Sequence, residues 1–188
     1  MTAIIITQPA SEPINLGDAK AHLRIDDYFE DSYLKVLIIA AREFAEGFVN
    51  GAFVDTTFRE VKEGFPESSF YLDKCQAHTI NSIKYIDPSG VEQTLAPEKY
   101  ESRMVGELLK VAAVDGCWPC TKISINAVVI EYVAGFGEQT DVPQQVKSAV
   151  KILLGSLHEN RENETIVKLE AVPMSAQYLL ARYKEERI

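Results

Sequence analysis

The sharpest chemical motif in the sequence is Cys117-Trp-Pro-Cys120, in which two residues separate two thiols. This spacing lets two thiols close a small disulfide ring, and a helix start makes the first thiol acidic. Here Pro119 and the strand expected after it place both cysteines in a turn, away from any helix start. As metal ligands they supply only two groups, so Cys75 and a histidine would have to complete the set. Cys117 and Cys120 are therefore weak redox or metal candidates, and the alternative is a turn whose Trp118 packs on the core.

Histidines and carboxylates give no stronger ligand pattern. His22, His78 and His158 lie far apart, outside any His-x-x-x-His or His-Glu-x-x-His arrangement. Residues 26–31 (Asp-Asp-Tyr-Phe-Glu-Asp) carry four carboxylates but lack the alternating spacing of a calcium loop. Carboxylates at this place favour the positive end of a following helix. We therefore predict no metal site and no cofactor.

Motifs of the common enzyme classes are missing from the sequence. It has no Gly-x-x-x-x-Gly-Lys-Ser/Thr loop, no Gly-x-Gly-x-x-Gly turn and no Gly-x-Ser-x-Gly elbow. Gly135-Phe-Gly137 follows a strand pattern, but no lysine follows it, which indicates a strand running into a loop. We predict that the chain is not an enzyme.

The composition narrows the class of protein and its partners. With 188 residues, the chain has the size of one domain carrying a modest insertion. Its net charge of −9 argues against a phosphate-binding face and against an anionic membrane surface. No apolar run approaches the ~20 residues of a membrane span, and the N-terminus lacks the basic start of a signal peptide. Three cysteines argue against a disulfide framework and favour a reducing compartment.

The first fifty residues show helical periodicity. Asn15 is a suitable N-cap for a short helix, because its side chain can accept a hydrogen bond from the first turn. A longer helix follows, whose apolar residues recur every three or four positions: Leu34, Leu37, Ile38, Ala41, Ala45 and Phe48. Asn50-Gly51 predicts the end of this helix, since glycine tolerates the left-handed conformation that terminates helices.

The middle of the sequence favours β structure. It is rich in β-branched and aromatic residues, and Asp87-Pro-Ser-Gly90 has the residue order of a four-residue turn. Residues 83–86 and 91–95 flank this turn, which predicts a β-hairpin. A long strand is expected over residues 122–133.

The last part of the chain is again helical in pattern. Asp141, followed by Pro143, predicts the start of one helix, and Pro173 opens a final one. These patterns predict an α+β fold with a mainly helical core of about four helices. An antiparallel β region is inserted between the second and third main helices. We expect one domain over residues 1–188, in which the β insertion spans 53–137 and helical residues 138–188 pack on helical residues 1–52.

Several short motifs follow one another in an order that resembles a known protein family. In sequence they are Glu12-Pro-Ile-Asn-Leu16, Ala19-Lys-Ala-His-Leu-Arg-Ile-Asp26, Ala40-Ala-Arg-Glu-Phe-Ala-Glu46, Trp118-Pro119, Val129-Ile-Glu-Tyr-Val-Ala-Gly-Phe-Gly137, Asp141-Val-Pro143 and His158-Glu-Asn-Arg-Glu162. In order and spacing, these motifs resemble the tailed-phage head-tail connector family, the gp6-like adaptor proteins, in its longer version with a β insertion.

The resemblance implies a structural protein of a phage or prophage. Such an adaptor forms a ring below the portal and links capsid to tail, with the portal protein and a tail-completion or stopper protein as partners. DNA passes through the ring without being read, so no sequence-specific nucleic acid is implied. The implied location is the virion neck, with the bacterial host cytoplasm during assembly. Relatives often carry Trp-Pro without flanking cysteines, which weakens the redox hypothesis for Cys117 and Cys120.

The final helix supplies the residues that we expect at an interface. It mixes apolar and aromatic groups with charges, a composition that suits contact with a partner. The side chains predicted for ring or portal contact are Tyr178, Leu179, Arg182, Tyr183 and Arg187. The alternative is a helix that covers its own core. Two other functions stay open: a small redox or metal-binding protein using Cys117 and Cys120, and a tail-side assembly module with the same mixed fold.

Overall fold

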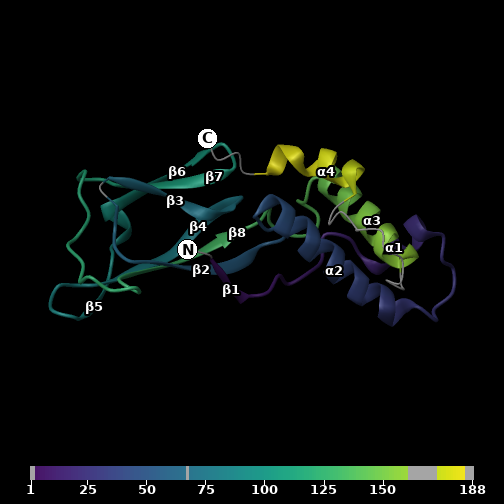
Figure 1. Cartoon of the computed structure of the whole chain (residues 1–188), viewed down its shortest axis with the longest axis horizontal. Coiled ribbons are helices and arrows are strands. Elements are labelled where there is room, and N and C mark those ends of the chain that lie inside the picture. The colour runs from purple at the N-terminus through teal and green to yellow at the C-terminus, as the bar shows by residue number, and fades with distance from the viewer. Residues whose placement is uncertain (1–2, 67, 161–172, 185–188) are drawn as a thin grey trace. The chain divides into compact units, whose positions relative to one another are not determined.

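The computed structural model describes residues 3–66, 68–160 and 173–184, which fold into two compact units. Figure 1 labels their helices and strands. A β unit contains the described residues of 1–9 and 55–135, and a helical unit contains those of 10–54 and 136–186.

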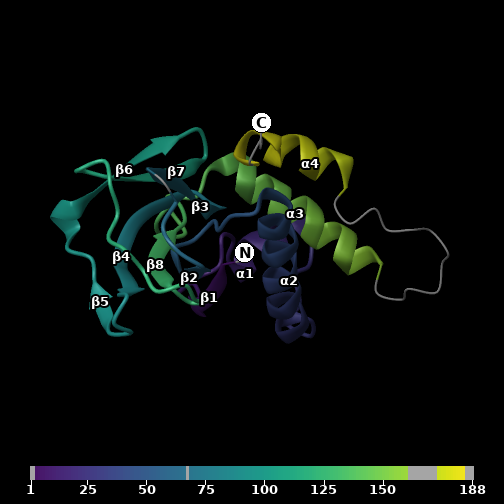
Figure 2. The same ribbon diagram turned by 60° about the vertical axis from the view of Figure 1, so that its left-hand side comes forward.

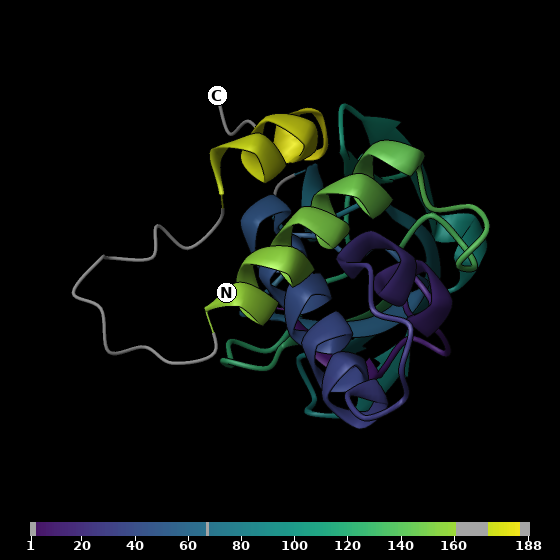
Figure 3. The same cartoon turned by 90° about the vertical axis from the view of Figure 1, so that its right-hand side faces the viewer.

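The described part of the helical unit contains four α-helices. They are α1 (Leu16–Leu23), α2 (Asp31–Val49), α3 (Gln144–Glu159) and α4 (Met174–Leu180), which continues into a 3-10 turn, η2 (Ala181–Tyr183). Helix α3 packs against the other three, and Figure 3 shows it crossing the unit between α4 and α1. None of the helices in the described ranges combines the length and the apolar character needed to cross a membrane.

The β unit is built from two antiparallel sheets. The larger has the order β1-β2-β8-β4-β5, and the smaller has the order β3-β7-β6 (Figure 2). The larger comprises β1 (Ile4–Thr7), β2 (Thr56–Lys62), β8 (Val128–Ala134), β4 (Ala77–Ile86) and β5 (Glu92–Thr94). The smaller comprises β3 (Ser69–Cys75), β7 (Leu108–Ala113) and β6 (Tyr100–Val105), with the 3-10 turn η1 (Pro97–Lys99) before β6. The predicted α+β class, with an antiparallel β region between the second and third helices, is confirmed.

Strand β8 lies at the centre of the larger sheet, and its side chains alternate between buried and partly buried positions. This period of two places Val128, Ile130, Tyr132 and Ala134 on the buried face. The Tyr132 ring stacks on Phe58 of β2 at a centroid distance of 5.9 Å. Burial raises the pKa of the Tyr132 hydroxyl, which accepts a hydrogen bond from the backbone N–H of Lys74.

The predicted hairpin is present between β4 and β5. The carboxylate of Asp87 accepts hydrogen bonds from the Ser89 hydroxyl, the backbone N–H groups of Ser89 and Val91, and the Gln93 amide. These bonds, the one from the Ser89 hydroxyl most of all, lower the pKa of Asp87 to about 2. Gly90 takes a positive φ of 89°, which only glycine adopts without strain.

A titration of Asp87 tests this turn. Because its pKa in the folded state lies below the usual 3.8, the contribution of Asp87 to stability is present above that value. It is lost as the pH falls through about 2. We expect the Ser89→Ala variant to raise the pKa of Asp87, as followed by NMR of the side-chain carboxyl. A Ser124→Ala variant, outside the hairpin, is the control, and an unchanged Asp87 titration in Ser89→Ala would contradict this account.

Helix ends follow the sequence signals with two differences. Asn15 caps α1 as predicted, because its side-chain oxygen accepts a hydrogen bond of 2.8 Å from the N–H of Asp18. At the end of α2, Asn50 rather than Gly51 adopts the left-handed conformation, with φ of 55°. Asp141 does not cap α3. Its carboxylate accepts from the N–H of Glu138, and α3 starts after Pro143 without a side-chain cap.

The strand expected over 122–133 begins only at Val128. Residues 123–127 form bends and a turn instead, closed by a hydrogen bond from the N–H of Ala127 to the carbonyl of Ser124. The strand prediction for this segment depended partly on Ile123, an apolar β-branched residue. In the structure Ile123 is 99% exposed and does not belong to a strand. Strand β1, in contrast, was not foreseen in residues 1–52.

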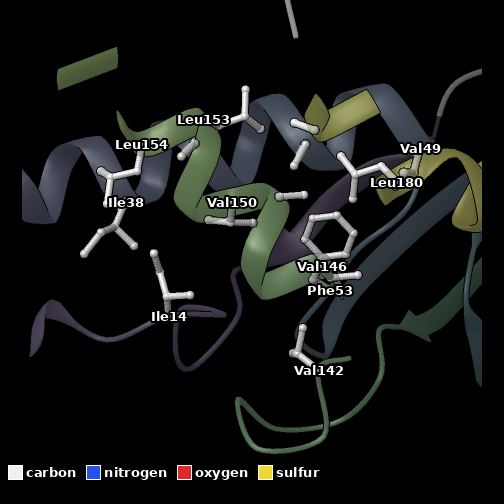
Figure 4. Packing of buried hydrophobic residues seen from close by; sticks show 14 of the residues in the cluster. Ile14, Ile38, Val49, Phe53, Val142, Val146, Val150, Leu153, Leu154 and Leu180 are labelled. Carbon is white, nitrogen blue, oxygen red and sulfur yellow. The ribbon is translucent and has the colours of Figure 1, made fainter. Parts of the chain in front are cut away.

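The core of the helical unit consists of apolar side chains from every helix (Figure 4). In this view Ile14, Ile38 and Leu154 lie toward one end of the cluster, and Val49 and Leu180 lie toward the other. The apolar residues at helical spacing therefore do face a core, and Arg42 of α2 is a charged residue that is buried as well.

Candidate assembly surfaces

The Cys117-Trp-Pro-Cys120 motif lies in the segment between β7 and β8, without regular secondary structure. Both of these cysteines are exposed and free, whereas Cys75 is buried. The Trp118 ring is partly buried and stacks on Phe65 at 4.7 Å between centroids, with 6° between the planes. The segment is thus anchored by its tryptophan, and neither exposed thiol lies at a helix start.

The three histidines occupy separate places. His158, on the last turn of α3, lies 2.8 Å from the carboxylate of Glu30, and His78 lies 3.1 Å from Asp55. His22 is on α1. Among the described residues, no group of three or more His, Cys, Asp or Glu side chains could hold a metal ion.

Helix α4 presents one outward face and one inward face. Ala176 and Leu180 are fully buried in the helical core, whereas Met174 and Tyr178, four residues apart, point outward. Tyr178 is 85% exposed, and Arg182 on the following 3-10 turn is also exposed. We call Met174, Tyr178 and Arg182 the α4 face. It is a surface of two large apolar or aromatic groups beside one cation.

The other residues predicted for ring or portal contact are placed differently. Leu179 is partly buried and packs against the helical core. Tyr183 is buried there, where its ring meets Phe136 edge-on at 5.6 Å and its hydroxyl lies 3.3 Å from the side-chain oxygen of Gln145. Arg187 lies outside the described residues. Of the predicted contact residues that the structure describes, Leu179 and Tyr183 therefore pack toward the core, and Tyr178 and Arg182 are accessible to a partner.

A second exposed surface lies at the turn from α1 into α2. We call residues 26–31 the acidic tip. Phe29 is 95% exposed and Tyr28 is 82% exposed, and both stand among carboxylates. The charges of this segment indicate a helix start, and no signal in the sequence distinguishes its exposed aromatic pair from core residues.

The acidic tip is held in a defined shape by Lys20 of α1. The Lys20 ammonium donates to the carboxylate of Asp31 at 2.8 Å and to the backbone carbonyl of Asp27, and it lies 4.4 Å from the centroid of the Tyr28 ring. The Asp27 carboxylate in turn accepts a hydrogen bond of 3.1 Å from the N–H of Phe29. These contacts hold the turn in a conformation in which Phe29 faces solvent.

Strand β1 forms an edge of the larger sheet and also carries exposed apolar residues. Ile4, Ile5 and Ile6 are all exposed, and β2 is the neighbour of β1 in the sheet. An apolar edge strand is a site at which another chain can pair. The sequence signal for it was present, as three consecutive β-branched residues.

Residues 13–85 match the model of a protein family described as phage gp6-like head-tail connector protein. The resemblance to this family is confirmed. The matched segment begins just before α1 and reaches almost to the end of β4, so it contains parts of both units. No curated protein sequence matches the chain.

Solved structures similar to the chain come from necks and virions of gene transfer agent (GTA) particles. A chain from the neck of an empty GTA particle, with C6 symmetry, has a TM-score of 0.83 and 20% identity. One from the virion of a native GTA particle has a TM-score of 0.82 and 21% identity. One from the neck of a native GTA particle, with C12 symmetry, has a TM-score of 0.76 and 21% identity. Each likeness covers 100% of this chain and 97% of the other, which establishes the fold.

Proposed function

We propose that the chain is a head-tail connector of a phage or prophage particle, an adaptor that forms a ring below the portal and links capsid to tail. The observation that carries the proposal is the likeness over the whole chain to a chain from the neck of a GTA particle. The connector family matched by residues 13–85 supports the same role. In this proposal residues 1–188 act as one connector domain, with the β residues 53–137 inserted between two helical parts.

The ring proposal is supported by the symmetry of the similar particles. Their necks have C6 and C12 symmetry, and a ring of about twelve copies would match such an axis. Contacts in such a ring are head-to-tail, so each subunit needs two different, complementary surfaces. The net charge of −9 suits a ring around DNA that must pass without being held, since like charges repel phosphate.

The partners in this proposal are other copies of the chain, the portal protein and a tail-completion or stopper protein. The α4 face is the surface that we assign to ring or portal contact, with Tyr178 as its centre, because large exposed aromatic groups dominate interfaces. Leu179 and Tyr183 hold the helix in place. The chain acts in the virion neck after assembly in the host cytoplasm, and it performs no enzymatic step.

Mixing the purified chain with the portal protein encoded beside it tests the proposal. We expect electron microscopy to show a ring of the chain bound to the portal, and light scattering to show the corresponding gain in mass. The portal alone and the chain alone are the controls. A portal that binds no copies of the chain, at concentrations where the chain stays folded, would overturn the adaptor role. A gene position deep among the tail genes would favour the tail-side module instead.

The double variant Cys117→Ser/Cys120→Ser separates the adaptor from the redox or metal alternative. Because both cysteines are exposed and Trp118 anchors the segment by itself, we expect unchanged thermal unfolding and unchanged ring formation on the portal. Phage titre should also stay within the error of the assay. Loss of assembly or titre in the double variant, with the fold intact, would support a role for the thiols.

A further inference from the structure

The acidic tip is suited to insert into a pocket. Phe29 and Tyr28 are among the most exposed large side chains of the described residues, and an aromatic side chain left in water gains most when a partner buries it. The contacts of Lys20 with Asp31 and Tyr28 fix the tip before any partner arrives. This preorganisation lowers the entropy that association must overcome.

The α4 face has the opposite charge character. Residues 173–184 contain Arg182 and Lys184 and no acidic side chain, and the glutamates at 185 and 186 lie outside the described residues. Residues 26–31, in contrast, contain four acidic side chains and no basic one. Asp31 already pairs with Lys20 and Glu30 lies beside His158, so the charge that the tip offers to a partner comes mainly from Asp26 and Asp27. Each surface also exposes two large apolar or aromatic groups. The two surfaces therefore match in both polarity and charge, which favours their encounter and disfavours contact between like copies of either.

The two surfaces lie at opposite ends of the helical unit. Figures 1 and 3 both show α4 at one end and the turn from α1 into α2 at the other. The acidic tip of one copy therefore cannot contact the α4 face of the same copy. Two different complementary surfaces at separate places on one unit form a head-to-tail contact, the kind that closes into a ring by rotation.

We propose that the acidic tip of one copy docks on the α4 face of the next copy in the ring, with Phe29 packed against Tyr178 and Met174, and with carboxylates of the tip near Arg182. This inference rests on the proposed ring function and specifies the contact between its subunits. The contact weakens as salt screens its charges.

Disulfide trapping tests the contact at the level of single residues. The variant Phe29→Cys/Tyr178→Cys is made in the Cys117→Ser/Cys120→Ser background, in which Cys75 is the remaining, buried thiol. Under a mild oxidant we expect a ladder of disulfide-linked species that extends beyond the dimer. A mixture of the two single-cysteine variants should stop at dimers, because each chain then offers one thiol. Ladder formation should decrease at high salt.

The control is Phe29→Cys/Ile123→Cys in the same background. Ile123 is more exposed than Tyr178, so random collision yields at least as much disulfide there. A Phe29–Tyr178 ladder no stronger than this control overturns the inference. If the wild-type chain still forms a ring on the portal in that case, the ring function stands and only the assigned contact is wrong. A ladder without any ring on the portal supports the contact and contradicts the adaptor role.

Discussion

Replacing Arg42 by methionine is expected to lower the free energy of unfolding by about 3 kcal/mol, because it leaves carboxylates without their cation in a largely buried place. The Arg42 side chain is only 4% exposed. Its guanidinium contacts Glu12 at 2.8 Å and Glu46 at 2.6 Å. Glu46 also accepts a hydrogen bond from the N–H of Phe53, beyond the end of α2. Arg42, in the second half of α2, therefore binds the segment before α1 directly through Glu12. It also connects to the segment after α2 through Glu46, which accepts the hydrogen bond from Phe53.

The size of this loss should depend on pH. Burial raises the pKa of Glu46, and Arg42 partly opposes that rise. Burial also works against the charge of Arg42, but Glu46 and Glu12 outweigh it and raise its pKa. In Arg42→Met the pKa of Glu46 rises further, so the folded state binds a proton more readily than the unfolded state. The stability of the variant then falls as the pH rises above the ordinary Glu value of 4.5 toward this raised pKa.

Denaturant unfolding at pH 5 and pH 8 measures both effects, and we expect the larger loss at pH 8. Arg59→Met is the matched control, because Arg59 pairs with Glu131 on an exposed surface, where such a pair contributes about 0–1 kcal/mol. Arg42→Met/Glu46→Gln should recover part of the loss, since the amide keeps an acceptor for the N–H of Phe53 without a buried charge. Equal losses for Arg42→Met and Arg59→Met would contradict this account.

The sequence predicted the parts of the fold whose signals are local. The cap at Asn15, the hairpin around Asp87 and the apolar spacing of α2 each depend on neighbours within a few residues, and each is found. Strand β1 was missed because its pairing partner, β2, lies about fifty residues away. Ile123 was assigned to a strand because exposure is invisible to a pattern that records only residue type.

The exposure of aromatic residues is hard to predict from sequence, for a related reason. An aromatic residue looks the same in sequence whether it faces a core or a partner. Tyr178 and Tyr183 were therefore grouped together, although one is exposed and the other is buried against Phe136. At the acidic tip, the charges of residues 26–31 indicate only a helix start, whereas in the structure Phe29 is exposed and Lys20 holds the turn.

Replacing Leu180 by alanine is expected to abolish assembly through loss of α4, whereas replacing Tyr178 by alanine should weaken assembly and leave α4 in place. Helix α4 has seven residues, too few to be stable without packing, and Leu180 is fully buried in the helical core. Truncating a buried leucine costs about 2–5 kcal/mol, enough to release such a short helix. Tyr178 is 85% exposed, so its truncation leaves the core intact.

Hydrogen exchange of the α4 backbone amides, measured together with ring formation on the portal, separates the two effects. In Leu180→Ala we expect faster exchange throughout residues 176–184 and no ring, while α2 and α3 keep their protection. In Tyr178→Ala we expect exchange close to that of the wild type and a weaker ring. Assembly of Leu180→Ala at the wild-type level, with α4 amides exchanging freely, would show that the ring does not use the α4 face. Leu180 packs in the core and Tyr178, two positions away, faces solvent. A loss of assembly in Tyr178→Ala with α4 still in place therefore comes from the exposed surface and not from unfolding of the helix.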